Sequence, residues 1–401
     1  MTGRWSGSWR RTLFACAMVV AAGVAAAHQE HQAAPKAAVP KALRPALGTS
    51  VAITPDGTWH AVTKRGEHVV LLRSTDQGVS WADVAQVNRE PEAISADGEN
   101  RPRLEFGKDG AVMVSWARAF EQRFTGDIRF ARSADGKHFD APVTVHHDRA
   151  IIGHSFNTML MTDTGQLIVA WIDGRGRAAA DQTGTDYRGS AIYTAISDDD
   201  GRSFRPEVKV ADHSCQCCRL TLTKDVGGQP LLLWRHVFEP NERDHALARL
   251  APDGSAASVE RVTFDGWKID ACPHHGPSLA IAEDGTRHAV WFNQRDGVGR
   301  VYYGRLGRGA IDGQRTVGGP RAAHADIAVS KGRVAIAWKE FDGERTHLWT
   351  EVSEDGGRSF IATDIASTTG AADQPRLLRD GEQLFVFWNT EHEGMKGYPL
   401  K

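Results

Sequence analysis

Two short runs of cysteine and histidine contain the residues of this sequence best suited to metal or redox chemistry. The first run is Cys215-x-Cys217-Cys218, and the second is Cys272-Pro273-His274-His275. Thiolate and imidazole are ligands that copper and zinc prefer in proteins. The two runs therefore predict a transition-metal site, with copper preferred and zinc as the alternative. His154 and His324 are further candidate ligands of the same site.

Disulfide bonds are the alternative interpretation of these cysteines. In an oxidising compartment a bond from Cys272 to one of the other three would join two neighbouring loops, and no cofactor would then be expected. Adjacent cysteines such as Cys217 and Cys218 bond to each other only with strain, so at least one thiol is expected to stay free. The histidines have two further possible roles, as general acid-base groups or as polar residues that bind water in a channel.

The elements that must position these residues are indicated by a repeated hairpin whose second strand ends in Trp. Six units end at Trp116, Trp171, Trp234, Trp291, Trp338 and Trp388, and a seventh, 50–63, has Thr in the place of Trp. Repeats of this length are typical of the four-stranded blades of a β-propeller. The sequence therefore predicts an all-β propeller of four-stranded antiparallel blades, with seven blades favoured and six as the alternative. The last unit is short, so its outer strand is expected to be missing or supplied by the N-terminal segment.

The candidate ligands stand just ahead of the innermost strands of their blades. A propeller brings such positions together around one axis. The six segments are 100–102, 154–157, 215–219, 272–276, 324–326 and 373–375. We therefore expect sulfur, imidazole and carboxylate groups to meet on one face of the central channel. A long polar insertion, 173–186, is expected to be a solvated loop or a lid over this face.

A second repeat has the frame Ser-x-Asp-x-Gly-x-x-aromatic, with one copy a residue shorter. Its Asp can accept hydrogen bonds from a tight turn, its Gly takes a positive φ, and its aromatic residue packs beneath. The frame resembles the Asp box, or BNR repeat, of the sialidase superfamily, which implies structural aspartates at the outer rim of the blades. The four aspartates are Asp76, Asp135, Asp199 and Asp355.

The resemblance to sialidases also implies an activity that requires three arginines around a carboxylate, a Tyr paired with Glu, and an acid-base Asp. The arginines that it suggests are Arg101, Arg219 and Arg295, but no Tyr–Glu pair is recognisable. The first hypothesis is therefore metal binding by the Cys/His cluster, for metal handling or redox chemistry. An exo-sialidase type of glycoside hydrolase and a non-catalytic interaction scaffold are the alternatives. The ligand at the channel face is expected to be a metal, a small molecule or a glycan.

The first residues have the features of a secretory signal peptide. They combine a basic start with an apolar run, Leu13–Ala27, that is too short for a comfortable membrane span. We expect a signal peptide at 1–27, a flexible tether at 28–48 and one propeller domain at 49–401. Arg10-Arg11 resembles a twin-arginine signal, so export to the periplasm or medium by either route is expected. The net charge of −2 indicates no affinity for nucleic acid, and no oligomeric state follows from the sequence.

Overall fold

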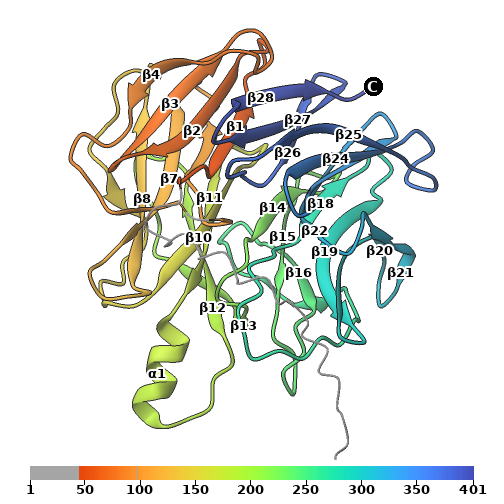
Figure 1. Ribbon diagram of the computed structural model, residues 1–401. Coiled ribbons are helices and arrows are strands. Elements are labelled where there is room, and N and C mark those ends of the chain that lie inside the picture. The colour runs from red at the N-terminus through yellow and green to blue at the C-terminus, as the bar shows by residue number, and fades with distance from the viewer. Residues whose placement is uncertain (1–44, 97) are drawn as a thin grey trace, which may run out of the picture. The chain divides into compact units, whose positions relative to one another are not determined.

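The computed structural model describes residues 45–96 and 98–401, and these residues fold almost entirely into antiparallel strands (Figure 1). The predicted signal peptide and nearly all of the predicted tether lie outside the described residues. The one α-helix of the described part, α1 (Arg175–Thr183), occupies the polar insertion, for which the sequence predicted only a loop or lid. A search of the same residues finds no helix with the length and hydropathy needed to cross a membrane.

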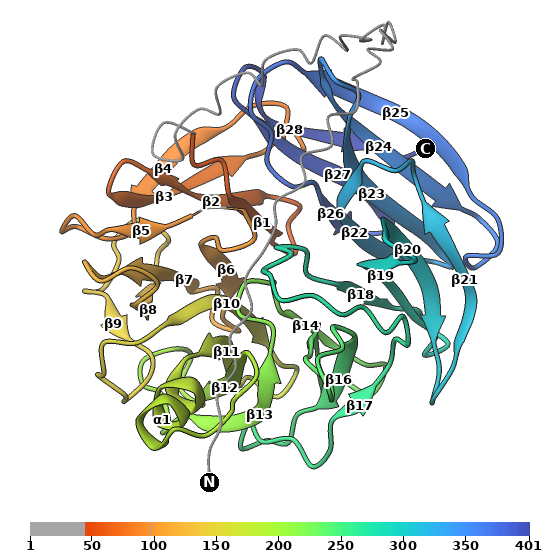
Figure 2. The ribbon, with the colours of Figure 1, turned by 60° about the horizontal axis from the view of Figure 1, so that its bottom comes forward.

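The strands form seven sheets, arranged in sequence order around one axis (Figure 2). Blade 1 contains β1 (Thr49–Ile53), β2 (Trp59–Arg65), β3 (His68–Ser74) and β4 (Ala82–Gln86). Blade 2 contains β6 (Arg103–Phe106), β7 (Val112–Ala119), β8 (Gly126–Ser133) and β9 (Val143–Thr144), with β5 (Ile94–Ser95) also paired to β7. Blade 3 contains β10 (His154–Met161), β11 (Leu167–Asp173), β12 (Ser190–Ser197) and β13 (Val208–Ser214).

The remaining blades follow the same order. Blade 4 contains β14 (Thr221–Lys224), β15 (Pro230–Arg235), β16 (His245–Arg249) and β17 (Glu260–Arg261). Blade 5 contains β18 (Ser278–Ile281), β19 (Arg287–Arg295), β20 (Val298–Leu306) and β21 (Ile311–Val317). Blade 6 contains β22 (Ala322–Ser330), β23 (Arg333–Phe341), β24 (Thr346–Ser353) and β25 (Ile361–Thr368). Blade 7 contains β26 (Arg376–Asp380), β27 (Gln383–Thr390) and β28 (Gly394–Pro399). The predicted seven-bladed propeller is therefore confirmed.

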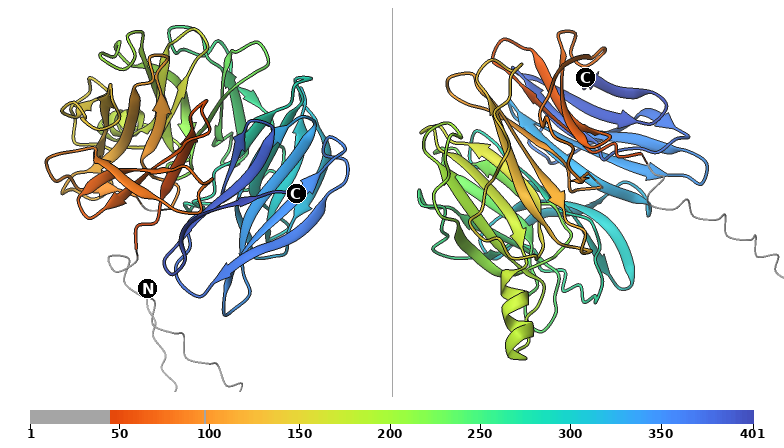
Figure 3. Two further views of the ribbon diagram at one scale, coloured as in Figure 1. Left: turned by 90° about the horizontal axis from the view of Figure 1, so that it is seen from above. Right: turned by 90° about the vertical axis from the view of Figure 1, so that its left-hand side faces the viewer.

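Blade 7 has three strands within the described residues. Among these residues, no strand from the start of the propeller joins its sheet, so contacts between blades 7 and 1 close the ring. Figure 3 shows this blade, in dark blue, beside the orange first blade. Side chains and main chain join the two. The N–H of Thr49 donates to Asp373 Oδ2 at 3.1 Å, and Trp59 Nε1 donates to Asp380 Oδ2 at 3.2 Å. The N–H of Gly397 also donates to the carbonyl of Gly78 at 3.0 Å.

The repeated tryptophans lie in the second strand of blades 2 to 7, where all six are almost completely buried. Burial of a large aromatic ring between blades removes much apolar surface from water, which stabilises the packing of one blade on the next. Each indole N–H still needs a partner. Trp171 Nε1, for example, donates to Asp173 Oδ2 at 2.8 Å. The repeat that predicted the blades thus also contributes to the apolar packing between them.

The aspartates of the Ser-x-Asp repeat lie in the turns between the third and fourth strands of their blades. In blade 3 the Asp199 carboxylate accepts from the N–H and the hydroxyl of Ser203, while Ser197 Oγ accepts from the N–H of Gly201 at 2.8 Å. Gly201 has a φ of +80°, and a Cβ there would meet the ring of Phe130 in blade 2 at 2.7 Å. The turn therefore also connects two blades.

We predict that Ser197→Ala lowers the free energy of unfolding by about 1–3 kcal/mol, because it leaves the buried N–H of Gly201 without an acceptor. Urea denaturation measures this loss. Ser203→Ala, at an exposed position of the same turn, is the matched control and is expected to cost less. Equal losses in the two variants would show that burial of the Ser197 bond is not the cause.

Candidate metal centre

The two cysteine-bearing loops connect the outer strand of one blade to the innermost strand of the next. The segment between β13 and β14 holds Cys215, Cys217 and Cys218, hereafter the cysteine trio, and the segment between β17 and β18 holds Cys272. Both segments approach the channel from the same side because they join neighbouring blades in the same sense. The structure therefore places the two runs on one face, as their position ahead of innermost strands predicted.

The sulfur atoms of the cysteine trio form a compact group. Sγ of Cys215 lies 3.1 Å from that of Cys218 and 3.8 Å from that of Cys217, and all three sulfurs lie within 4.8 Å of one another. The three side chains are 0%, 4% and 1% exposed in sequence order, and Phe156 packs against them. All four described cysteines are free thiols. Sulfurs bound at about 2.3 Å around one ion lie about 4 Å apart, so this group needs only small shifts to coordinate a metal.

Hydrogen bonds and nearby arginines favour one thiolate within the trio. The thiols of Cys217 and Cys218 hydrogen bond to Cys215, which lowers the pKa of Cys215 and raises the pKa of Cys217. Arg235 adds a favourable charge, and Arg243 places a guanidinium nitrogen 3.9 Å from Cys215 Sγ. Metals bind thiolate rather than thiol, so this electrostatic environment assists the first step of binding.

Cys272 differs from the trio because it is exposed. A hydrogen bond with Cys217 lowers the pKa of Cys272 to about 7, against the opposing effect of its partial burial. Its loop is held at both ends. Trp267 is buried and accepts the N–H of Arg243 through its carbonyl, while Gly276 packs so closely on Arg219 that a Cβ would collide with the Arg219 main chain.

Glu99, which the sequence analysis did not identify, connects the two cysteine loops. Its buried carboxylate accepts from the N–H of Arg219 at 2.9 Å and from the N–H of Gly276 at 2.6 Å, and Arg219 Nη1 adds a bond at 3.1 Å. Burial alone would raise the pKa of Glu99, but the charge of Arg219 and a bond from His324 hold it below the usual range. Arg219 directly follows Cys218, so one carboxylate fixes both loops. The only sequence signal was its place beside the segment 100–102.

The predicted histidine ligands lie in different surroundings. His275 stacks between Phe292 and His324, with ring centroids 4.2 Å apart on each side, and His324 Nδ1 lies 3.4 Å from Glu99. His154 stacks on His146, and its Nδ1–H donates to the carbonyl of Gly126 at 2.8 Å. His274 is exposed. Across residues 45–96 and 98–401, the compact group of candidate metal ligands consists of the cysteine trio, without these histidines.

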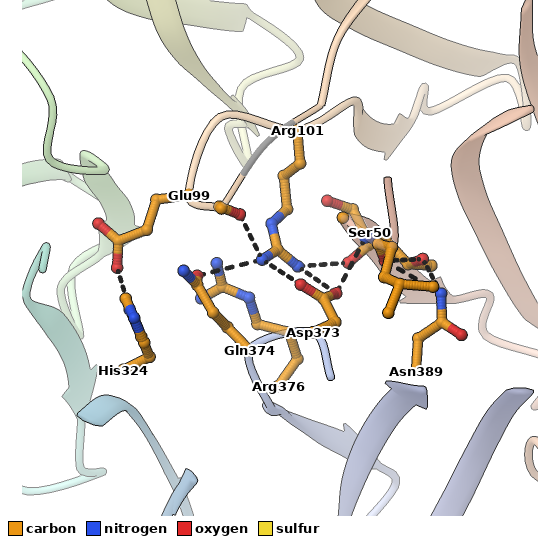
Figure 4. A network of polar contacts seen from close by, with 12 residues as sticks. Ser50, Glu99, Arg101, His324, Asp373, Gln374, Arg376 and Asn389 are labelled. Carbon is orange, nitrogen blue, oxygen red and sulfur yellow. Dashed lines mark hydrogen bonds and ion pairs between the residues drawn. The ribbon is translucent and has the colours of Figure 1, made fainter. Parts of the chain in front are cut away.

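The three arginines that a sialidase would need are not brought together as free cations. Arg101 donates to both oxygens of Asp373, at 2.9 and 2.8 Å, and also to Gln374 Oε1 (Figure 4). Arg219 is paired with Glu99, whose carboxylate Figure 4 shows beside His324. Arg295 lies at the end of β19, where its Nε donates to Asp265 Oδ1 at 2.6 Å. Arg101 and Arg219 are thus each neutralised by a buried carboxylate, which makes them members of structural ion pairs.

Comparison with known proteins supports the fold. Neither a family model nor a curated protein sequence matches the chain. Among solved structures, an ulvan lyase of polysaccharide lyase family PL25 has a TM-score of 0.56 at 12% identity, over 89% of this chain and 92% of that one. A protein of unknown function from Dyadobacter fermentans has a TM-score of 0.53 at 13% identity, over 78% and 95%. An α-L-arabinofuranosidase of Fusarium graminearum has a TM-score of 0.51 at 12% identity, over 77% and 95%. Likeness at this level shows a propeller fold alone.

Proposed function

We propose that this protein is an exported metal-binding β-propeller whose cysteine trio holds Cu(I) for metal handling. The observation that carries the proposal is the group of three buried, free sulfurs within 4.8 Å of one another. Soft thiolate ligands select Cu(I), zinc or iron–sulfur clusters. Structural zinc takes four protein ligands, whereas this buried group offers three, and three sulfurs suit Cu(I). Zinc is the alternative metal.

Charge balance also supports a thiolate-bound ion. One Cu(I) with three thiolates carries two negative charges, and two arginines lie beside the trio. The side-chain bonds of Arg235 go to Asn293 and to main-chain carbonyls, so its charge remains available to the sulfurs. Arg243 approaches Cys215 directly. A cluster of buried anions is stabilised by such cations, because buried charge is costly unless it is compensated.

Glycoside hydrolysis at the channel face has less support. The three arginines that the sialidase resemblance suggested, Arg101, Arg219 and Arg295, already bind carboxylates of the protein itself. A substrate carboxylate would have to displace Asp373 or Glu99 from these buried pairs. A scaffold without any ligand leaves the clustering of three free thiols without an explanation.

Metal content is the direct test. We predict that protein purified with its thiols reduced and supplied with Cu(I) retains stoichiometric copper, and that the variant Cys217→Ser/Cys218→Ser retains none. Elemental analysis after desalting measures the metal, and thiol counting on the metal-free protein measures the free cysteines. Circular dichroism establishes that the variant is folded. Stoichiometric zinc in place of copper would identify zinc as the bound metal. Absence of both metals from the wild type would contradict the proposal.

A further inference from the structure

Solvent exposure separates the four thiols into two kinds. The cysteine trio is almost completely buried, and the exposed residue of its own loop is Gln216, which has no sulfur. Cys272 is exposed, and its loop shares the buried carboxylate of Glu99 with the loop of the trio. An ion in solution therefore meets Cys272 before it meets the trio. Burial shields the bonds between a metal and its permanent ligands from solvent. The trio has this shielding and Cys272 does not.

The loop that carries Cys272 is fixed at its ends and open at its tip. Towards one end, Asn241 Nδ2 donates to Asp270 Oδ1 at 2.5 Å, and at the other end the N–H of Gly276 donates to Glu99. Between these anchors, Cys272 and His274 are exposed, and His274 has a positive φ of 54°. A backbone held at both ends keeps the exposed thiol on the loop beside the trio without enclosing it.

We propose that Cys272 is an exchange ligand, which accepts Cu(I) from a thiolate complex in solution and transfers it to the cysteine trio. This inference rests on the proposed function and deepens it, because it makes the site one for metal transfer rather than for permanent storage. The partner chemistry is a Cu(I)–thiolate complex, small or carried by another protein.

The transfer consists of ligand exchanges without electron transfer. The thiol of Cys272 gives its proton to solvent and its thiolate bonds to copper, while one thiolate of the donor leaves copper and takes up a proton. Cys217 then bonds to the same ion, and Cys215 and Cys218 follow as the remaining donor ligands and Cys272 leave. Each sulfur that binds from its thiol form releases a proton, each sulfur that departs as thiol takes one up, and copper remains Cu(I) throughout. Release follows the same steps in reverse.

The test compares rate and equilibrium in Cys272→Ser. With Cu(I)–glutathione as the donor and bathocuproine disulfonate as the acceptor, we expect the variant to load and lose copper about tenfold or more slowly, equivalent to ~1.4 kcal/mol in the exchange barrier. Its final copper content is expected to equal that of the wild type. His274→Gln, at the same exposed loop tip, is the matched control and is expected to exchange at the wild-type rate. Brief alkylation of the metal-free wild type, which modifies the exposed thiol first, is expected to reproduce the variant without a substitution.

The possible results separate the two proposals. A wild type that takes up no copper contradicts the proposed function itself. A wild type that binds copper, with a Cys272→Ser variant that exchanges as fast, overturns only the exchange role. Loss of copper from Cys272→Ser at equilibrium would make Cys272 a permanent fourth ligand, which also overturns it. Equal slowing in His274→Gln would assign the effect to the loop instead of the thiol.

Discussion

Replacement of Glu99 by Gln is expected to lower the free energy of unfolding by about 3–5 kcal/mol, because removal of one partner leaves the other charge of a buried pair uncompensated. The remaining charge is Arg219, whose side chain is 2% exposed. The substitution also weakens the acceptor of the N–H of Gly276, so the two cysteine loops lose their common anchor. Copper affinity is therefore expected to fall together with stability. Urea denaturation and competition with a copper chelator measure the two effects.

Asp373→Asn is the matched control for this prediction. Asp373 is as deeply buried and paired with Arg101 in the same channel, but its bonds go to the seam between blades 7 and 1 and not to the cysteine loops. It is expected to destabilise the fold by a comparable amount while the copper affinity of the folded protein stays unchanged. If both variants lose copper equally, the role of Glu99 is general stability and not the positioning of the loops.

Acidification from pH 6.5 to pH 4 is expected to destabilise the protein strongly, because several buried histidines are held neutral in the fold. Burial lowers the pKa of His146, His288 and His324 from 6.5 to about 4 each. The unfolded chain therefore binds protons at these residues before the folded chain does, and stability falls as the pH falls through this window. For each histidine, the free energy of unfolding at pH 4 is expected to be lower than at neutral pH by on the order of 3 kcal/mol.

The pH dependence of urea unfolding measures this effect, and its slope reports the number of protons taken up on unfolding. In the variant His288→Gln the slope between pH 6.5 and 4 is expected to fall by about one proton, since the amide keeps a bond to Tyr303 Oη and cannot titrate. His392→Gln, at an exposed position, is the control. A free energy of unfolding that stays constant across this range would refute the prediction.

The fold was predictable because its signal is repeated. A tryptophan at the end of each second strand marks every blade from the second to the seventh, and a repeat of that kind has few architectures to choose from. The same reasoning placed the two cysteine runs on one face, because equivalent positions of neighbouring blades must meet around the axis. The repeat could not predict which of the cysteines on that face are buried and which are exposed. Cys272 and Cys217 are both cysteines ahead of innermost strands, but only the structure separates the exposed thiol from the buried one.

The residue that organises the site was not predictable from its type or spacing. Glu99 belongs to no motif, and its importance arises from two main-chain N–H groups more than one hundred positions away. His154 illustrates the opposite case, since it stands at an equivalent position but stacks on His146 away from the sulfurs. Side-chain direction at the end of an inner strand depends on local bulges, such as the register shift between Ser155 and Thr158. Such shifts leave little trace in a single sequence.

The clamp between Arg101 and Asp373 has a consequence for the order of events during synthesis. These two residues are 272 positions apart, and all four described cysteines lie between them in the chain. During synthesis the four cysteines therefore leave the ribosome well before Asp373, whose carboxylate fixes Arg101, has been made. Until residue 373 has emerged and docked, the guanidinium of Arg101 lacks its buried carboxylate, and the N–H of Thr49 in blade 1 lacks its acceptor. Closure of the ring between blades 7 and 1 is therefore one of the last steps of folding, after nearly the whole chain has been made.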